Sequence, residues 1–241
     1  MRQVGLILQA RMSSTRLLGK SMMPLAGQPL VARILERLKR VRGIHHLILA
    51  IPNTPTDDPL EKLGKDLEVD VFRGSESNLL ERYYEAAKKF NLDTVLRVPA
   101  DNVASEPIEI EKIIKFYLSN SYDFCSNLSQ VFDNGYPDGI GAEVFSFNLL
   151  EKFANEQTDQ EKMEHIHLNF FNYKTQQPGP GIRVGTIECS DDIRRPDIVL
   201  DVNTLEQYEL MNSMYQDLYP LNSIFGIRDI IKWWDKNEKV S

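Results

Sequence analysis

Short apolar runs rich in β-branched residues recur along the chain, and segments with helical spacing separate them. Parallel strands need a long, usually helical connection between them, so this alternation is typical of a mostly parallel sheet with helices on both faces. The sequence therefore predicts an α/β fold. The expected strands are Val4–Gln9, Leu47–Ile51, Val69–Phe72, Thr94–Val98, Phe124–Ser126, Glu143–Phe147, Ile182–Thr186 and Ile198–Val202.

Helix-start signals occur in the segments between these strands. Asn78 with Glu81, and Thr204 with Gln207, have the spacing of a capping box, in which a polar side chain accepts a hydrogen bond from the backbone three residues on. Helices are expected over Pro29–Arg42, Asp58–Leu67 with Asp58 as its N-cap, Asn78–Phe90, Pro107–Ser119, Gln160–Tyr173, Thr204–Tyr219 and Ile224–Trp234.

The composition favours one folded domain. Of the 241 residues, 42% are hydrophobic and 26% are charged, and a chain of this length can bury a core without disulfides. No repeat or low-complexity linker divides it, so we expect a single domain over residues 1–241 with an inserted region at about 130–185. Cys125 and Cys189 lack the spacing of a disulfide framework or metal site. Without a secretory signal or a long apolar run, a cytoplasmic location is expected.

The net charge of −7 is distributed unevenly. The first 42 residues hold nine basic residues and one acidic residue, whereas the remainder is strongly acidic. Such a chain is poorly suited to nonspecific duplex binding, which needs a broad basic face, and it favours one compact anion site. We expect Arg11, Arg16 and Lys20 at that site. Four further arginines are expected on the solvated face of a helix: Arg33, Arg37, Arg40 and Arg42.

The loop after the first strand is the first candidate for a ligand site, because ligands of open α/β sheets bind beyond the carboxyl ends of the strands. Residues 9–20 read QARMSSTRLLGK. Small and hydroxyl residues let backbone amides approach a polyphosphate, and the basic side chains offset its charge. The loop has neither a Walker nor a dinucleotide-binding glycine pattern, which argues against a P-loop kinase and a Rossmann dehydrogenase.

This loop, together with residues 24–30 (PLAGQPL), resembles the signature of the SpsF-like cytidylyltransferases, which are named after a spore coat polysaccharide biosynthesis protein and are related to the Kdo and sialic acid cytidylyltransferases. The resemblance implies a GT-A-like nucleotide-diphospho-sugar transferase fold, with a mostly parallel mixed sheet flanked by helices. It also implies a nucleotidyltransferase that releases pyrophosphate. Further matching segments are 72–75, 80–83, 97–101, 136–139, 143–145, 164–166 and 200–204.

The resemblance also implies roles for individual residues. Asp101 follows the expected strand Thr94–Val98, and it and Asp201 would hold Mg²⁺. Arg11 and Lys20 complete the expected catalytic group. The backbone groups of Leu8 and Ala10 are expected to recognise the base. The full set of residues expected to bind the nucleotide is Leu8, Ala10, Arg11, Met12, Arg16, Lys20, Asn53, Arg73, Asn78 and Asp101.

The acceptor side is less defined by sequence. Tyr136, Asp138, Glu143 and His165 are the expected substrate-binding residues, although residues 136–141 could equally form an ordinary hairpin or a dimer contact. The chain departs from the family pattern at Leu18, where proline is usual, at Asn78, where aspartate is usual, and over residues 102–104. That last segment reads Asn-Val-Ala in place of Cys-Pro-Leu, which puts the standard acceptor in doubt.

Several functions stay open at this point. The leading one is Mg²⁺-dependent transfer of CMP from CTP to a sugar, sugar acid or phosphorylated acceptor, for surface polysaccharide synthesis, by a homodimer that binds neither nucleic acid nor membrane. A guanylyl- or uridylyltransferase acting on a sugar 1-phosphate, and a noncatalytic nucleotide-binding subunit, are the alternatives. A phosphorylated acceptor needs extra basic contacts, which Arg183, Arg194 and Arg195 could supply unless they form surface ion pairs.

Overall fold

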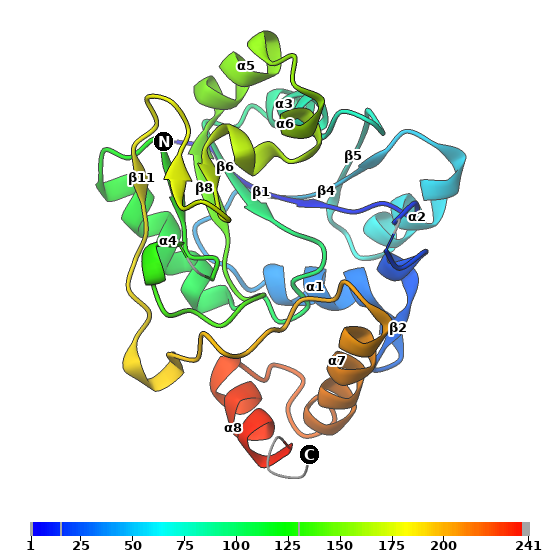
Figure 1. The fold of residues 1–241 in the computed structure, drawn as a ribbon. Coiled ribbons are helices and arrows are strands. Elements are labelled where there is room, and N and C mark those ends of the chain that lie inside the picture. The colour runs from blue at the N-terminus through cyan, green and yellow to red at the C-terminus, as the bar shows by residue number, and fades with distance from the viewer. Residues whose placement is uncertain (1, 15, 130, 238–241) are drawn as a thin grey trace.

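The computed structural model describes residues 2–14, 16–129 and 131–237, and its centre is a seven-stranded sheet in the order β11-β7-β8-β6-β1-β4-β5 (Figure 1). Strands β1, β4, β5 and β6 are parallel, β8 is antiparallel to β6 and β7, and β11 is parallel to β7. This mixed, mostly parallel sheet confirms the predicted fold class. The strands are β1 (Val4–Gln9), β4 (His46–Pro52), β5 (Asp70–Gly74), β6 (Thr94–Val98), β7 (Phe124–Ser126), β8 (Glu143–Ser146) and β11 (Val184–Gly185).

Helices cover both faces of this sheet. Successive residues of β1 point to opposite faces, so Leu6 and Leu8 pack in one apolar core and Ile7 in another. The first core includes α1, α4, α7 and α8, and the second includes α3 and α5. The helices are α1 (Leu30–Leu38), α2 (Asp58–Asp66), α3 (Leu79–Lys89), α4 (Pro107–Ser119), α5 (Phe147–Glu156), α6 (Gln160–Glu164), α7 (Leu205–Leu218) and α8 (Ile227–Asn237). Two short hairpins, β2 (Pro24–Leu25) with β3 (Gln28–Pro29) and β9 (Phe171–Asn172) with β10 (Gln177–Pro178), lie outside the main sheet.

The predicted helix starts are confirmed at two of three positions. Thr204 forms a full capping box with Gln207, and the Asn78 side chain accepts a hydrogen bond from the backbone N–H of Glu81. The expected N-cap at Asp58 is wrong, because α2 already includes that residue. Asp57 precedes the helix instead, and its carboxylate accepts hydrogen bonds from the Met12 N–H (2.8 Å) and the Thr54 hydroxyl (2.6 Å).

Two other predicted elements differ from the structure, and one helix was missed. The helix expected over Gln160–Tyr173 ends at Glu164, because the Asn169 side chain donates hydrogen bonds to the Lys162 and Ile166 carbonyls and folds the chain into a short 3₁₀ turn. Residues 198–202 form isolated bridges and no strand. Helix α5 was not predicted, because the apolar run of β8 continues into it without a break.

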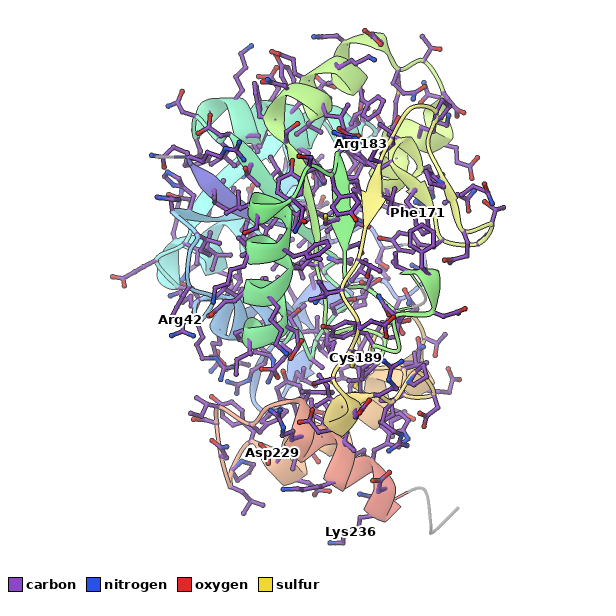
Figure 2. All side chains as sticks on the ribbon, turned by 90° about the vertical axis from the view of Figure 1, so that its left-hand side faces the viewer. Arg42, Phe171, Arg183, Cys189, Asp229 and Lys236 are labelled. Carbon is purple, nitrogen blue, oxygen red and sulfur yellow. The ribbon has the colours of Figure 1, made fainter. Side chains whose placement is uncertain are left out.

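The arginines of α1 are also buried where the sequence predicted a solvated face. The exposed fraction of Arg33 is 4% and that of Arg37 is 3%, because the guanidinium groups donate to the Leu25 and Ser105 carbonyls, respectively. The C-terminal helices α7 and α8 lie together at one end of the molecule (Figure 1). Figure 2 shows Asp229 and Lys236 of α8 there, far from Arg183 at the other end. No described helix is both long and apolar enough to cross a membrane.

Candidate functional site

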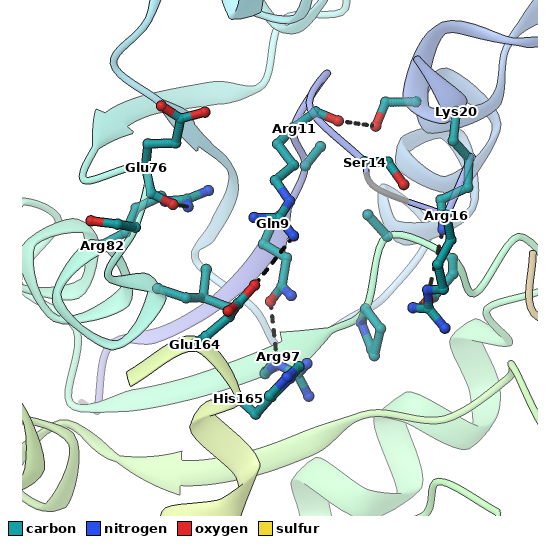
Figure 3. A pocket seen from close by; sticks show the side chains of 17 residues that line it. Gln9, Arg11, Ser14, Arg16, Lys20, Glu76, Arg82, Arg97, Glu164 and His165 are labelled. Carbon is teal, nitrogen blue, oxygen red and sulfur yellow. Dashed lines mark hydrogen bonds and ion pairs between the residues drawn. The ribbon is translucent and has the colours of Figure 1, made fainter. Parts of the chain in front are cut away.

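A cleft of about 220 Å³ opens at the carboxyl ends of β1 and β6 (Figure 3). The loop after β1 forms one wall, and the segment after β6 forms another. Residues 76–82, which lead into α3, and Glu164 and His165 at the end of α6 complete the lining. The cleft therefore lies where the sheet topology places ligand sites, as the sequence predicted.

Asp101 and Asp201 lie on neighbouring segments beside this cleft, although they are 100 positions apart in the sequence. The N–H of Val202 donates to the Asp101 carbonyl (3.0 Å), and Asn102 and Asp201 form an antiparallel bridge. Burial and the nearby carboxylates of Asp138 and Asp101 raise the pKa of Asp201 to about 6. The structure thus concentrates negative charge at this point.

Lys20 lies against these carboxylates. Its ammonium nitrogen donates to the Val202 carbonyl (2.6 Å) and lies 4.0 Å from Asp101 Oδ2. Burial lowers the pKa of Lys20, the Asp101 carboxylate opposes that effect, and Arg16 adds to it. Gly19 allows the loop to turn here, because its φ of 69° is in the left-handed region and its N–H donates to the Met12 carbonyl (3.1 Å).

Arg11 extends across the cleft toward the opposite wall. Its guanidinium forms an ion pair with the Glu164 carboxylate (3.3 Å), and both side chains are partly exposed (Figure 3). The Arg11 carbonyl accepts a hydrogen bond from the Ser21 hydroxyl (3.1 Å), which fixes the backbone of the loop. Arg16 is exposed and also lines the cleft. The loop therefore brings Arg11, Arg16 and Lys20 to one site, as predicted.

The floor of the cleft is a buried hydrogen-bonded network. Arg97, on β6, forms an ion pair with Glu143 of β8 (2.7 Å) and donates to the Gln9 side-chain oxygen (3.2 Å). That oxygen also accepts a hydrogen bond from the Tyr83 hydroxyl (2.6 Å), and the Tyr173 hydroxyl donates to Glu143 (2.7 Å). Burial raises the pKa of Tyr83 and Tyr173, so both phenols stay protonated and can donate.

Several lining residues were not among the predicted site residues. Gln9 and Arg97 were missed although both lie near the carboxyl end of an expected strand, which was the available signal. Arg82 and Glu164 lay within segments that resemble the family, but nothing in their spacing pointed to the cleft. The lining includes these side chains and Glu76.

Four predicted nucleotide-binding side chains lie elsewhere. Asn53 is exposed, and Asn78 caps α3. Arg73 forms ion pairs with Asp58 and Glu61 of α2. The fourth, Met12, donates its N–H to Asp57 as described above. The two residues expected to use their backbone are close to the cleft: Leu8 is buried in β1, and Ala10 lines the cleft.

The predicted acceptor residues have different positions. His165 lines the cleft, and Glu143 is buried in the floor network. Tyr136 is buried in the core, and its hydroxyl donates to Glu109 (2.8 Å). Asp138 is half-buried on the Asp201 side, and burial followed by the Asp101 charge raises its pKa.

The three arginines considered as extra acceptor contacts form surface ion pairs. Arg183 pairs with Asp123, Arg194 with Glu188 and Asp191, and Arg195 with Asp197 and Asp235. None of the three belongs to the lining of the cleft as described.

Comparison with known proteins identifies this architecture. The chain aligns with a CMP:2-keto-3-deoxy-manno-octonic acid synthetase solved with CTP at a TM-score of 0.68 and 14% identity, over 90% of this chain and 99% of the other. The fold is therefore that of a nucleotidyltransferase. A structure of a cytidylyltransferase from Leptospira borgpetersenii aligns at a TM-score of 0.87 and 27% identity, over 100% of this chain and 97% of that one.

Sequence comparison gives the family. The spore coat polysaccharide biosynthesis protein SpsF of Bacillus subtilis is 28% identical over 221 residues, which cover 90% of this chain and 88% of the relative. A family model described as cytidylyltransferase matches residues 6–219. The chain belongs to the cytidylyltransferase family, whose members are enzymes, and it is related to the Kdo cytidylyltransferases. The resemblance inferred from the sequence is confirmed.

Proposed function

We propose that this enzyme transfers CMP from CTP to a sugar, sugar acid or phosphorylated acceptor, with Mg²⁺ and with release of pyrophosphate, to supply surface polysaccharide synthesis. One observation carries the proposal: two carboxylates from distant parts of the chain, Asp101 and Asp201, lie together beside Lys20 at the carboxyl edge of the sheet. A basic loop of the length and composition that suits a triphosphate borders them.

In the proposed reaction an oxygen of the acceptor attacks the α-phosphorus of CTP, and the bond to the β-phosphate breaks. Lys20 and Arg16 stabilise the charge that develops on the departing pyrophosphate, the electrostatic contribution that is usually largest in such reactions. Arg11 joins them once it leaves its ion pair with Glu164. The backbone amides of the loop bind the phosphates that these side chains surround.

The residues present fit a magnesium ion. Asp101 and Asp201 would hold it, and it would offset charge on the phosphate oxygens when bound. The raised pKa of Asp201 reflects buried, crowded carboxylates that a cation would relieve. In the part of the chain that the structure describes, no group of three or more His, Cys, Asp or Glu is arranged to hold a metal. Two carboxylates are sufficient for Mg²⁺, which keeps waters and takes further oxygens from phosphates.

Arg82 is the basic group best placed to meet an anionic acceptor. Its guanidinium donates to the Ser75 (2.8 Å) and Glu76 (3.3 Å) carbonyls and forms no ion pair with a described carboxylate. Arg97, in contrast, is neutralised by Glu143. A carboxylate or phosphate of the acceptor would therefore find Arg82 on the cleft wall. The homodimer and the cytoplasmic location remain predictions from the sequence.

The first test is thermal stabilisation by CTP, GTP, UTP and ATP, each with and without Mg²⁺, because a ligand that binds only the native state raises its stability. A Mg²⁺-dependent shift with CTP alone supports the proposal. A shift selective for GTP or UTP would instead favour a guanylyl- or uridylyltransferase, and no shift with any nucleotide would contradict nucleotide transfer.

Pyrophosphate release with a panel of sugar acids and sugar phosphates then tests catalysis. Asp101→Asn should abolish release while CTP binding persists, and Asp66→Asn, on the exposed surface of α2, is the matched control. Unchanged turnover in Asp101→Asn would overturn the assignment of the metal carboxylates.

A further inference from the structure

A second cavity, of about 200 Å³, lies between α1, the C-terminal end of α7 and the loop that precedes α8. It is nearly as large as the cleft, and the two described linings share no residue. Arg33, Arg37 and Arg40 line it together with the aromatic side chains of Tyr219 and Phe225. We call it the arginine pocket.

Two of these arginines are fully engaged by the fold. Arg33 donates to the Leu25 carbonyl (3.0 Å) and pairs with Glu36 (2.8 Å). Arg37 donates to the Ser105 carbonyl (2.7 Å) and the Phe225 carbonyl (3.0 Å). Glu106 lies 3.5 Å from Arg37 and is not part of the described lining. These contacts account for the burial of both residues.

Arg40 is the exception. Its Nε atom is buried without a hydrogen-bond partner, and its side chain makes no hydrogen bond or ion pair with any residue the structure describes. The neighbouring carboxylate, Glu36, is already paired with Arg33. Burial lowers the pKa of Arg40, the nearby Arg37 charge adds to that effect, and the carboxylates of Glu106 and Glu36 oppose it. The residue as a whole is half-buried, so its guanidinium faces the pocket with one buried N–H donor that no described group accepts.

The walls indicate what would complete it. The Tyr219 ring lies 3.9 Å from the Arg33 guanidinium carbon, and the Phe225 ring lies 5.0 Å from that of Arg37. Glu36 pairs with Arg33 and Glu106 lies beside Arg37, so Arg40 is the basic group of the described lining that no ion pair offsets, which favours an anion. A planar guanidinium matches phosphate oxygens in pairs. We propose that the arginine pocket is a second ligand site, which takes a small aromatic phosphate monoester with its phosphate on Arg40 and its aromatic ring against Tyr219 and Phe225.

The pocket is connected to the segment that carries Asp101. Arg37 holds the carbonyl of Ser105, and the Tyr215 hydroxyl, also in the lining, donates to the Val103 carbonyl (2.6 Å). A ligand on Arg40 would therefore affect the position of the backbone that follows Asp101. If the proposed function is correct, the ligand should also change the affinity of the cleft for nucleotide, and nucleotide should change its affinity equally.

Isothermal titration of the full chain with phenyl phosphate, without nucleotide or metal, tests the pocket independently of the proposed function. Arg40→Gln should weaken binding at least about tenfold, the effect of losing a charge-assisted hydrogen bond. Arg42→Gln is the matched control, because the Arg42 side chain is 83% exposed and pairs with Glu111. Arg16→Gln reports on the cleft instead, because phenyl phosphate held there would be lost in that variant and kept in Arg40→Gln. Inorganic phosphate should bind more weakly than phenyl phosphate, and Tyr219→Leu should reduce that difference.

Other results would overturn the proposal. Binding that persists in Arg40→Gln, binding that is lost in Arg16→Gln, or no binding by the parent chain at millimolar phenyl phosphate would each do so. If Arg40→Gln does not fold, the Tyr219→Leu variant still tests the proposal. A Tyr219→Leu variant that prefers phenyl phosphate over inorganic phosphate as strongly as the parent chain would show that the phenyl ring does not contact Tyr219, and it would overturn the proposal.

Discussion

Lys20 and Asp101 lie 4.0 Å apart at one side of the cleft, whereas Arg97 and Glu143 lie 2.7 Å apart on its floor. The floor pair is buried, and Gln9 and Tyr173 supply further hydrogen bonds to it. The Lys20 pair belongs to a crowded group of charges that includes a carboxyl, Asp201, with a raised pKa. The charges of the floor are satisfied by one another, whereas the carboxylates beside Lys20 are crowded. If the proposed function is correct, one side of the cleft serves stability and the other serves the ligand.

The largest expected effect is on the floor. Glu143→Gln leaves the Arg97 charge buried without a carboxylate, so it should lower the free energy of unfolding by about 3–5 kcal/mol. Urea denaturation measures this, with Glu156→Gln on the exposed side of α5 as the control. A loss below about 1 kcal/mol would mean that water reaches Arg97 and that the two sides of the cleft do not differ as described.

The carboxylate side should respond in the opposite way. Asp201→Asn removes one of the crowded carboxylates, so stability at neutral pH should stay equal or rise by about 1 kcal/mol. Turnover should fall by about 10²–10³-fold, as when a key electrostatic group is removed from an active site. Thermal unfolding and pyrophosphate release measure the two effects. If Asp201→Asn lowered the free energy of unfolding as much as Glu143→Gln does, the floor and the carboxylate side would not differ in the way described.

The pH dependence of stability, through His167 beside the floor network, gives a further test of this comparison. Its ring packs against Tyr173, and its pKa is lowered to about 4, first by burial; Glu143 opposes the shift, and Arg97 and His165 add to it. The unfolded chain, with an ordinary pKa near 6.5, binds more protons between these values. The contribution of His167 to the free energy of unfolding should therefore be fully present above pH 6.5. It should fall by at most about 3 kcal/mol as the pH drops to 4. His167→Phe should show a flatter profile in urea denaturation over this range, and an unchanged slope would contradict the assignment.

The smallest effect is expected at the ion pair that spans the cleft. Glu164→Gln frees Arg11, and because both side chains are partly exposed, stability should change by less than about 0.5 kcal/mol. CTP affinity, measured by titration, should rise about two- to fivefold, since Arg11 no longer has to leave a carboxylate. Weaker CTP binding would indicate that Glu164 itself contacts the ligand.

Much of this site could be predicted from local sequence. The loop at residues 9–20 and Asp101 both follow apolar strands, and parallel topology brings such positions to one edge. Asp201 required the family resemblance, because residues 198–202 pair only through isolated bridges. The start of α5 carried a weak signal: the Ser146 side chain caps it by accepting a hydrogen bond from the Leu149 N–H (3.2 Å).

The buried charges could not be predicted in this way. Arg33 and Arg37 have the spacing of a charged helix surface, but Arg37 donates to the Ser105 and Phe225 carbonyls, which are far along the chain. Arg33 donates to the Leu25 carbonyl in the turn before its own helix, a contact that the helical spacing does not show. Arg97 likewise depends on Glu143, on an antiparallel strand whose pairing with β6 no local pattern specifies. Long-range partners decide whether a charge is solvated, and a single sequence does not give them.

The position of Asp201 beside Asp101 has a consequence for biosynthesis. During translation the loop at residues 9–20 and β6 emerge from the ribosome long before residues 198–202, so a nascent chain can form most of the parallel sheet without completing the site. Nucleotide could then assist only the last stage of folding, when the C-terminal segment docks along residues 101–103. Incomplete chains that end before residue 201 would hold the basic loop but lack Asp201, and under the proposed function they would be inactive.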